Sequence, residues 1–191
     1  MARIRTFIAV DVGTVIRDRM IEMQASIAKE VADVKWVEPD NLHLTLLFLG
    51  EVNDRDLLAV CRCVSKATAE RSAFPLEVRG IGCFPNPRRP RVLWAGIAEG
   101  AEELIALHAA LEPPLLEQGC YRREERRYTP HITLGRVNDE SAAEPIAKML
   151  PKHQAWNGGY STVKELLVMS SELTSKGPTY AILARGRLSK A

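Results

Sequence analysis

Two segments of the sequence, NLHLTLLFLG and TPHITLGRV, each place a histidine and a threonine two residues apart among aliphatic residues. In a β-strand, side chains at positions i and i+2 project from the same face, so we expect His43 beside Thr45 and His131 beside Thr133. The leucine or isoleucine between them projects from the opposite face and anchors the strand. Each strand is therefore predicted to present an imidazole and a hydroxyl together.

Two imidazoles and two hydroxyls in one cleft suit the in-line cleavage of a phosphodiester. That reaction needs a base for the attacking oxygen, an acid for the leaving oxygen, and donors to the phosphoryl oxygens. Histidine, with an ordinary pKa near about 6.5, can be either acid or base, and threonine can donate to a phosphoryl oxygen. No metal or cofactor is required. One such motif is usually a packing feature, but its recurrence favours a wet cleft, because a buried polar pair is costly unless it is hydrogen-bonded.

The hydrophobic pattern predicts a strand, helix, strand, helix, strand order that occurs twice along the chain. The first pass has a strand over 6–12, a helix over 14–32, the strand NLHLTLLFLG, a helix over 54–70 and the strand FPLEVRGIGCF, and the strand RPRVLWAGI opens the second pass. The second has a helix from about Glu102, the strand TPHITLGRV, a short helix near 141–150, and strands at about 159–172 and 179–188. Pro113-Pro114 is expected to end or interrupt the helix from Glu102, because proline removes a backbone donor and clashes with the preceding turn.

The two motifs lie at matching places of this repeat, with His43 and His131 separated by 88 residues. We therefore predict an α+β fold with two lobes related by a pseudo-two-fold axis. Each lobe is expected to be an antiparallel sheet with helices packed on its outer face, and the active cleft is expected between the sheets. Residues 1–191 are predicted to form one bilobal domain, and we expect it to be a monomer.

The composition favours a compact globular protein. The chain has 191 residues, of which 46% are hydrophobic, enough for a sizeable core. No stretch approaches the roughly eighteen apolar residues of a membrane span, and the N-terminus lacks a signal-peptide pattern, so we expect no membrane and a cytoplasmic location. Four cysteines without C-x-x-C spacing indicate reduced thiols. The net charge of +2 demands no nucleic-acid partner, although arginines cluster at 88–91, 122–127 and 185–187.

Several longer segments resemble the two-histidine phosphoesterase superfamily, in particular its 2′-5′ RNA ligase branch, the RNA 2′,3′-cyclic phosphodiesterases. The segments are WVEPDNLHLTLLFLGEV, RPRVLWAGI and RRYTPHITLGR, with a weaker similarity in KELLVMSSELTSKGPTYAILARGRL. The resemblance implies a bilobal α+β fold and metal-independent hydrolysis of a terminal RNA 2′,3′-cyclic phosphate to a 2′-phosphate. It also implies that RNA ends can be joined through a 2′-5′ linkage without ATP.

The resemblance assigns roles to the two motifs. His43 would be the proton donor that protonates the 3′ leaving oxygen, and His131 the proton acceptor that activates water. Thr45 and Thr133 would hold the phosphate. The partner implied is RNA with a 2′,3′-cyclic phosphate end or a small cyclic nucleotide.

Arg136 matches an arginine that follows the second motif in the family and is expected to contact the phosphate. Strict alternation along the strand would turn Arg136 away from His131, whereas a bulge at Gly135 would turn it inward.

Other residues near the motifs are interpreted from their surroundings. Tyr128 is expected at the cleft mouth, where it could stack on a base. Trp36, Phe48 and Trp94 are expected to pack in the core. His108 and His153 have no partner threonine and are interpreted as ordinary helix-surface and loop residues.

Three alternatives stay open at this point. A non-catalytic RNA-binding module of the same fold would bind RNA in a salt-dependent manner and tolerate loss of both histidines. A metal hydrolase is disfavoured, because neither motif has the carboxylate or cysteine neighbours common at zinc sites. Within the enzyme class, a cyclic nucleotide or ADP-ribose cyclic phosphate is a rival substrate.

Overall fold

The computed structural model describes residues 3–122, 126–175 and 177–189. Its strands are β1 (Arg3–Val10), β2 (Val34–Trp36), β3 (Leu44–Asn53), β4 (Phe74–Phe84), β5 (Val92–Ile97), β6 (His131–Val137), β7 (Asn157–Val163), β8 (Glu165–Thr174) and β9 (Gly177–Arg187). Its α-helices are α1 (Gly13–Ile27), α2 (Leu57–Ala69), α3 (Ala101–Glu117) and α4 (Ala143–Met149). Short 3₁₀ turns precede or follow several of them, among them η1 (Pro39–Asn41), η3 (Glu140–Ala142) and η4 (Leu150–His153).

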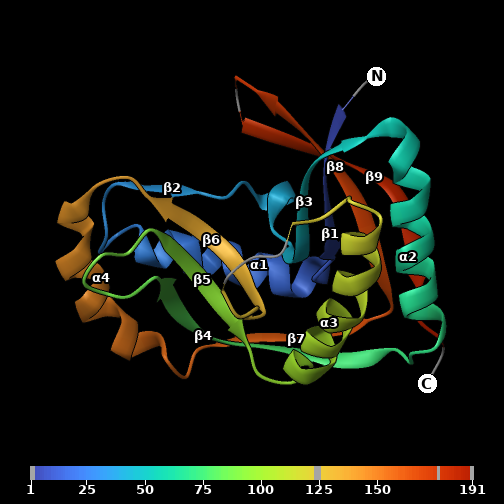
Figure 1. Cartoon of the computed structure of the whole chain (residues 1–191). Coiled ribbons are helices and arrows are strands. Elements are labelled where there is room, and N and C mark those ends of the chain that lie inside the picture. The colour runs from blue at the N-terminus through green and yellow to red at the C-terminus, as the bar shows by residue number, and fades with distance from the viewer. Residues whose placement is uncertain (1–2, 123–125, 176, 190–191) are drawn as a thin grey trace.

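The described strands form one antiparallel sheet in the order β7-β4-β5-β6-β3-β1-β8-β9, with β2 paired to β6. We call β3, β1, β8 and β9 the β3 half, and β6, β5, β4, β7 and β2 the β6 half. The two halves lie on the right and left of Figure 1 and meet where Leu44 of β3 pairs with Ile132 of β6. Because these are the central residues of the two His-x-Thr motifs, the pseudo-two-fold axis passes beside this pair. The predicted bilobal α+β fold is confirmed.

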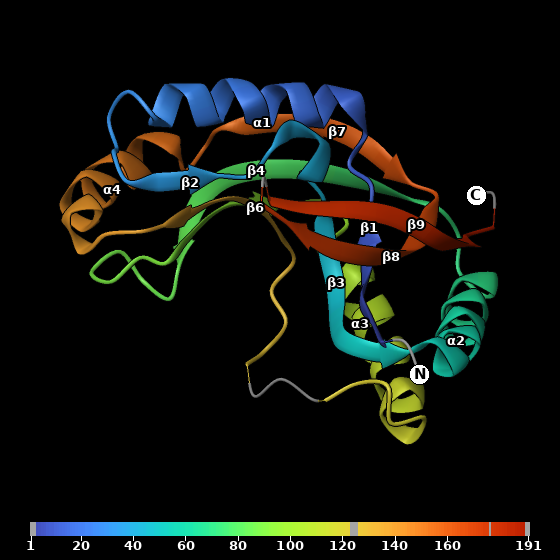
Figure 2. The ribbon, with the colours of Figure 1, turned by 90° about the horizontal axis from the view of Figure 1, so that it is seen from above.

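The helices do not all cover the half to which the strand before them belongs. Helix α1 packs against β7 of the β6 half, although the strand before it, β1, belongs to the β3 half (Figure 2). Helix α2 packs against β8 and β9, and α3 packs against α2 and β3. Fully buried aliphatic side chains fill the space between helices and sheet, including Ile16 of α1, Leu44 of β3 and Leu104 of α3. Burial of each such side chain is worth about 1.5–3 kcal/mol.

Helix α3 does not end at the two prolines, contrary to the sequence prediction. It runs from Ala101 to Glu117 and contains both Pro113 and Pro114. Leu111 and Leu115, on either side of the prolines, are fully buried against the core. Their packing offsets the roughly 3 kcal/mol that a proline costs inside a helix.

The strand predicted over 159–172 is two strands. β7 ends at Val163 and pairs with β4, whereas β8 begins at Glu165 and pairs with β1. Lys164 is the single residue between the two strands, and no glycine or proline marks the change of half in the sequence. Strand β2 was also missed, because three residues are too few for a periodic signal.

Candidate active site

The paired strands bring the two His-x-Thr motifs together. Leu44 and Ile132 are completely buried and face the core. The histidine and threonine on either side of each are half-buried and project from the other face of the sheet. An antiparallel register through the Leu44–Ile132 pair sets Thr45 opposite His131, and both line the same cavity.

Both histidines make the same backbone hydrogen bond. The His43 Nδ1 lies 2.7 Å from the carbonyl oxygen of Asn41, and the His131 Nδ1 lies 2.7 Å from that of Thr129. A carbonyl oxygen can only accept, so each Nδ1 carries a proton and donates it. The Nε2 atom of each ring is left as the nitrogen that can exchange a proton with a ligand.

The rings are held by different neighbours. The His43 Nε2 lies 2.9 Å from Thr45 Oγ1, and the ring is flanked by Phe7 and Tyr180, with centroids at 5.0 and 5.3 Å. His131 is flanked by Phe84 and Trp94, with centroids at 5.0 and 6.4 Å. Among the described residues, His131 and Thr133 share no hydrogen bond of the kind that joins His43 to Thr45.

Burial lowers the pKa of both imidazoles. For His43 and for His131, loss of water around the ring lowers the pKa below its ordinary value, and the hydrogen bond to the backbone carbonyl opposes this only in part. The free site therefore favours neutral imidazoles. A bound phosphate anion would favour the charged form, because an opposite charge nearby raises the pKa of a histidine.

A β-bulge in β6 determines where Arg136 points. Leu93 of β5 pairs with Gly135, but the next residue, Trp94, pairs with Thr133, so Leu134 is the extra residue. Leu134 and Gly135 are both buried, and Arg136 after them is exposed. The bulge thus shifts the alternation and puts Arg136 on the face of Thr133 and His131. The charge of Arg136 also acts on Tyr180, whose ring meets His43 edge-on.

A buried glutamine of α1 stabilises this bulge. The Gln24 Nε2 donates to the carbonyl oxygens of Leu134 and Val37, both at 2.9 Å, and the Val37 N–H also donates to Leu134 O at 2.9 Å. A bulge takes its carbonyl out of the strand ladder, and here side-chain and backbone donors replace the lost partner. Gln24 was not recognised in the sequence, where it looked like one more residue of an amphipathic helix.

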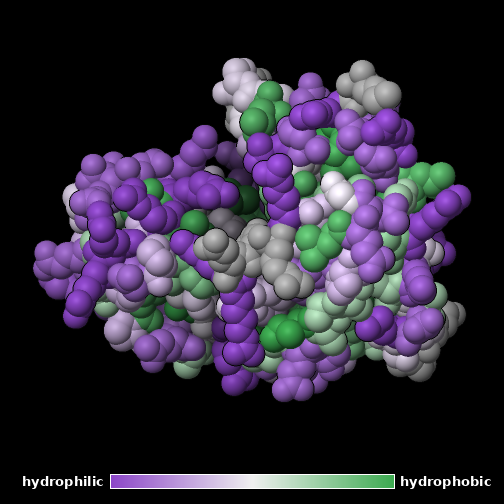
Figure 3. Space-filling model, viewed as in Figure 1, coloured by the Kyte–Doolittle hydropathy of each residue, from purple (hydrophilic) through white to green (hydrophobic). Residues whose placement is uncertain are grey.

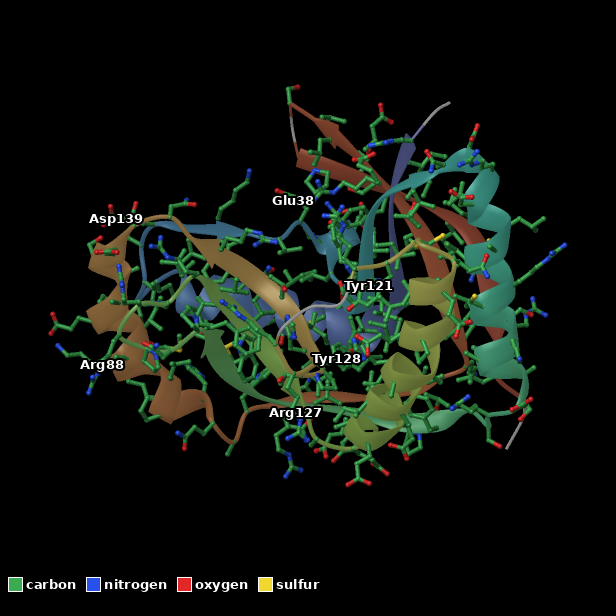
Figure 4. The ribbon with its side chains drawn as sticks, viewed as in Figure 1. Glu38, Arg88, Tyr121, Arg127, Tyr128 and Asp139 are labelled. Atoms are coloured by element: carbon green, nitrogen blue, oxygen red, sulfur yellow. The ribbon has the colours of Figure 1, made fainter. Side chains whose placement is uncertain are left out.

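Tyr128 links the two motifs and closes a cavity beside them. Its hydroxyl donates to the carbonyl oxygen of Thr45 at 3.1 Å, and burial raises the pKa of the phenol, which keeps it a donor. The cavity, of about 120 Å³, is lined by residues that include Thr45, His131, Tyr128, Glu112 and Tyr121. Figure 4 places Tyr121 and Tyr128 in the middle of the molecule, beside α3.

His108 is not an ordinary helix-surface residue, contrary to the sequence interpretation. Its ring stacks on Tyr128, with centroids 4.3 Å apart and planes at 10°, and it lines the same cavity. One face of the Tyr128 ring is therefore already covered by protein. His153, in contrast, lies in η4, away from the two motifs.

The arginine-rich loop lies away from the two histidines. Arg88 and Asp139 are at the far end of the β6 half, next to α4 (Figure 4). Arg89 and Arg91 each lie 3.7 Å from the carboxylate of Glu140. Between the halves, the surface is hollowed, with hydrophobic atoms at depth and hydrophilic ones around them (Figure 3).

Three further features concern the described residues as a whole. No group of three or more histidine, cysteine, aspartate or glutamate side chains among them is arranged to hold a metal ion. No helix within the described ranges is long and apolar enough to cross a membrane. The four cysteines are free thiols.

Two related half-sheets, each contributing a His-x-Thr motif to one cleft, define a two-histidine phosphoesterase. The family model described as LigT-like phosphoesterase matches the chain twice, over residues 10–94 and 96–180, which agrees with the internal duplication. The chain belongs to the LigT-like phosphoesterase family.

Similar proteins cover nearly the whole chain. A protein named RNA 2′,3′-cyclic phosphodiesterase from Methanothermobacter thermautotrophicus is 36% identical over 97% of this chain and 100% of its own length. One of the same name from Archaeoglobus fulgidus is 36% identical over 92% and 96%. The crystal structure of TT0787 of Thermus thermophilus has a TM-score of 0.81 at 29% identity, covering 97% and 98% of the two chains. E. coli LigT complexed with 3′-AMP has a TM-score of 0.79 at 27% identity, covering 98% and 99%.

Proposed function

We propose that the protein is an RNA 2′,3′-cyclic phosphodiesterase, which hydrolyses a terminal 2′,3′-cyclic phosphate to a 2′-phosphate. His131 takes a proton from the attacking water at its Nε2, and His43 gives a proton from its Nε2 to the 3′ oxygen as the P–O3′ bond breaks. Thr45, Thr133 and Arg136 bind the phosphoryl oxygens. His131 takes up one proton and His43 releases one, so the net charge of the site does not change. Proton exchange with solvent then restores the starting protonation state of each histidine.

The observation that carries this proposal is the matched placement of the two imidazoles. Each Nδ1 is occupied by a backbone carbonyl, and both rings lie on one face beside the Leu44–Ile132 pair. An in-line displacement needs an acid and a base on opposite sides of phosphorus, and two strands related by a pseudo-two-fold axis supply that geometry. Relatives named RNA 2′,3′-cyclic phosphodiesterase, at 28–36% identity, support the substrate.

Substitution of each histidine tests the proposal. His43→Ala and His131→Ala should each lower kcat/KM for an RNA 2′,3′-cyclic phosphate by about 10²–10⁴-fold, the usual contribution of a general acid or base. His153→Ala, a histidine outside the site, should keep wild-type activity. Wild-type activity should also survive EDTA. A fold check by circular dichroism accompanies each variant, and a folded His43→Ala or His131→Ala enzyme with most of its activity would refute the assignment.

The non-catalytic alternative has a different signature. A binding module would hold RNA with salt-dependent affinity, and both alanine variants would bind as the wild type does. Its site would have no use for two imidazoles with the same fixed tautomer. The rival small substrates are separated by assaying 2′,3′-cyclic nucleotides, ADP-ribose cyclic phosphate and cyclic-phosphate-ended oligonucleotides side by side, with the product position read by NMR.

We also infer that one chain is sufficient for the reaction, because both motifs lie in one sheet of one chain. The mass of the active species, measured by light scattering as it elutes from a size-exclusion column, tests this inference. The 2′-5′ joining of RNA ends stays a prediction. It uses a 5′-hydroxyl in place of water, and a gel assay with cyclic-phosphate and 5′-hydroxyl oligonucleotides tests it.

A further inference from the structure

We call the face of the β6 half that carries His131 and Thr133 its cleft face. This face continues beyond the two motifs and also carries the indole of Trp94. Trp94 of β5 is paired directly with Thr133 on one side and with Gly82 of β4 on the other. Residues directly opposite one another in an antiparallel pair share a face, so the indole lies on the same face as Thr133 and His131. The ring is partly exposed, contrary to the core position expected from the sequence.

Gly82 allows the indole to lie flat on the sheet. A Cβ at Gly82 would come within 2.3 Å of the Trp94 Cη2 and Cζ2 atoms and 2.8 Å of Cε2. A point that close to three successive atoms of one ring stands over the ring face, not beside its edge. One face of the indole therefore rests on the glycine, and the ring forms a platform of the kind on which nucleobases stack.

Two cations continue the same face. Lys35 of β2 is paired directly with Arg136 of β6, and both are exposed. Within the part of the chain that the structure describes, neither has a carboxylate oxygen within 4 Å. Arg136 lies five residues along β6 from His131, at most roughly 17 Å at 3.3 Å per residue, so Lys35 faces a point beyond the reacting phosphate.

The strand next to the first motif in the β3 half, β1, presents no exposed ring of this kind among its described residues. On β1, the strand next to the first motif, Ala9 is paired with Thr45 as Trp94 is with Thr133, and the aromatic residue of that strand, Phe7, is only 3% exposed. Arg5 on the same strand is paired opposite Glu51, and its guanidinium lies over the Phe48 ring at 4.8 Å. A nucleic-acid strand that leaves the site therefore finds a partly exposed aromatic ring followed by two exposed cations on the β6 half.

We propose that the cleft face of the β6 half is a binding site for the RNA strand, with a base stacked on Trp94 and the phosphodiester on the 5′ side of that nucleotide held by Lys35. This inference rests on the proposed function and extends it. The preferred substrate is an oligonucleotide end, because a mononucleotide lacks the phosphodiester that Lys35 binds.

Lys35→Ala tests the phosphate contact. We expect kcat/KM for a hexanucleotide with a 2′,3′-cyclic phosphate end to fall about five- to tenfold, and its log–log salt dependence to become shallower by about one unit of slope. The value for 2′,3′-cyclic AMP should not change. Lys66→Ala, which removes an exposed lysine from α2, is the matched control and should change neither substrate.

Trp94→Leu tests the base contact, because its effect can be compared between a substrate with a nucleobase and a substrate without one. We expect about a tenfold loss of kcat/KM for 2′,3′-cyclic AMP, the size of one lost stacking contact, and little change for glycerol 1,2-cyclic phosphate. Trp94→Phe, which keeps an aromatic ring, should recover most of the loss. A purely structural role for Trp94 would lower the activity on both substrates equally.

The outcomes separate this inference from the proposed function. If the wild type hydrolyses neither the mononucleotide nor the hexanucleotide, the proposed function fails. If it hydrolyses both, but Lys35→Ala changes both alike or neither, the RNA site on the β6 half is wrong. The same conclusion follows if Trp94→Leu does not distinguish the base-free substrate, and if that variant does not fold, the Lys35 measurement decides alone.

Discussion

Compared with His131, His43 lies in the more enclosed half of the site. Its ring is more deeply buried, its Nε2 contacts the Thr45 hydroxyl, and the Asn41 residue that orients it is bonded to Pro178 of β9. His131 has the same backbone bond but lines the open cavity. Duplication thus supplies two equivalent proton carriers, and their surroundings distinguish them. A reaction that needs an acid on one side and a base on the other requires such a difference.

The largest effect should come from a substrate whose leaving group needs no proton, because such a substrate separates the role of the acid from that of the base. If His43 protonates the leaving oxygen, His43→Ala should lose about 10²–10⁴-fold on an RNA 2′,3′-cyclic phosphate. It should lose far less on a 3′-deoxynucleoside 2′-(4-nitrophenyl) phosphate, in which nitrophenolate takes the place of the 3′ oxygen and leaves without a proton. His131→Ala should lose as much on the activated substrate as on the natural one.

The comparison of the two substrates is internal to each variant, so differences in protein stability cancel. Equal losses of His43→Ala on both substrates, with His131→Ala relieved by nitrophenolate, would reverse the roles of the two histidines. The paired-histidine mechanism itself would stand in that case.

The next largest effect concerns Gln24, which supports the bulge in the β6 half only. Gln24→Met keeps the volume but removes both hydrogen bonds, so we expect stability to fall by about 1–3 kcal/mol and kcat/KM to fall about ten- to hundredfold as Arg136 loses its orientation. Thermal unfolding and steady-state assays measure the two effects. Met23→Leu on the same helix, a volume-conserving change of a buried residue, should leave the activity intact.

A double variant shows whether Gln24 acts through Arg136. In an Arg136→Ala background, Gln24→Met should cost little further activity, because residues in one network are not additive. A full additional loss would mean that the glutamine supports some other part of the site.

Features determined by a single segment could be predicted from the sequence. Strand β4 coincides with FPLEVRGIGCF, and the same-face placement of each histidine with its threonine follows from the period of two residues in a strand. The pairing of the two motifs followed from their repetition at matching positions. These features need no knowledge of what a residue contacts elsewhere in the chain.

Features that depend on distant contacts could not be predicted. The Gln24–Leu134 bond joins residues 110 apart, and no local pattern marks it. The sequence suggested a bulge at Gly135 as one of two possibilities, and only the pairing with β5 decides between them. The stacking of His108 on Tyr128 and the passage of α3 through Pro113 depend on packing in the same way.

The pH profile should show the difference between the two histidines. In the free enzyme, kcat/KM falls as pH drops below the pKa of the base and as pH rises above the pKa of the acid. Burial lowers the pKa of both histidines below 6.5, so we expect the optimum on the acidic side of neutrality and a loss of about tenfold per pH unit above it. Measurement of kcat/KM from pH 5 to 9 checks this.

Variants that expose one histidine at a time assign each limb of that pH profile to one of the two histidines. Tyr180→Ala exposes His43, so the pKa of His43 should rise and the high-pH limb should move to higher pH. Phe84→Ala exposes His131 and should move the low-pH limb to higher pH. Movement of the opposite limb in each case would exchange the acid and the base.

The smallest effect should come from the residues whose carbonyls orient the rings. Asn41 donates from its Nδ2 to Pro178 O at 2.8 Å, which fixes the carbonyl that holds His43. Asn41→Ala should lower stability by about 0.5–1.5 kcal/mol and kcat about two- to fivefold, because the carbonyl remains but its anchor to β9 is lost. Thr129→Ala is the matched control, since Thr129 is exposed and offers His131 only its backbone carbonyl. If Thr129→Ala is as harmful as Asn41→Ala, the enclosed and the open histidine do not differ in how they are held.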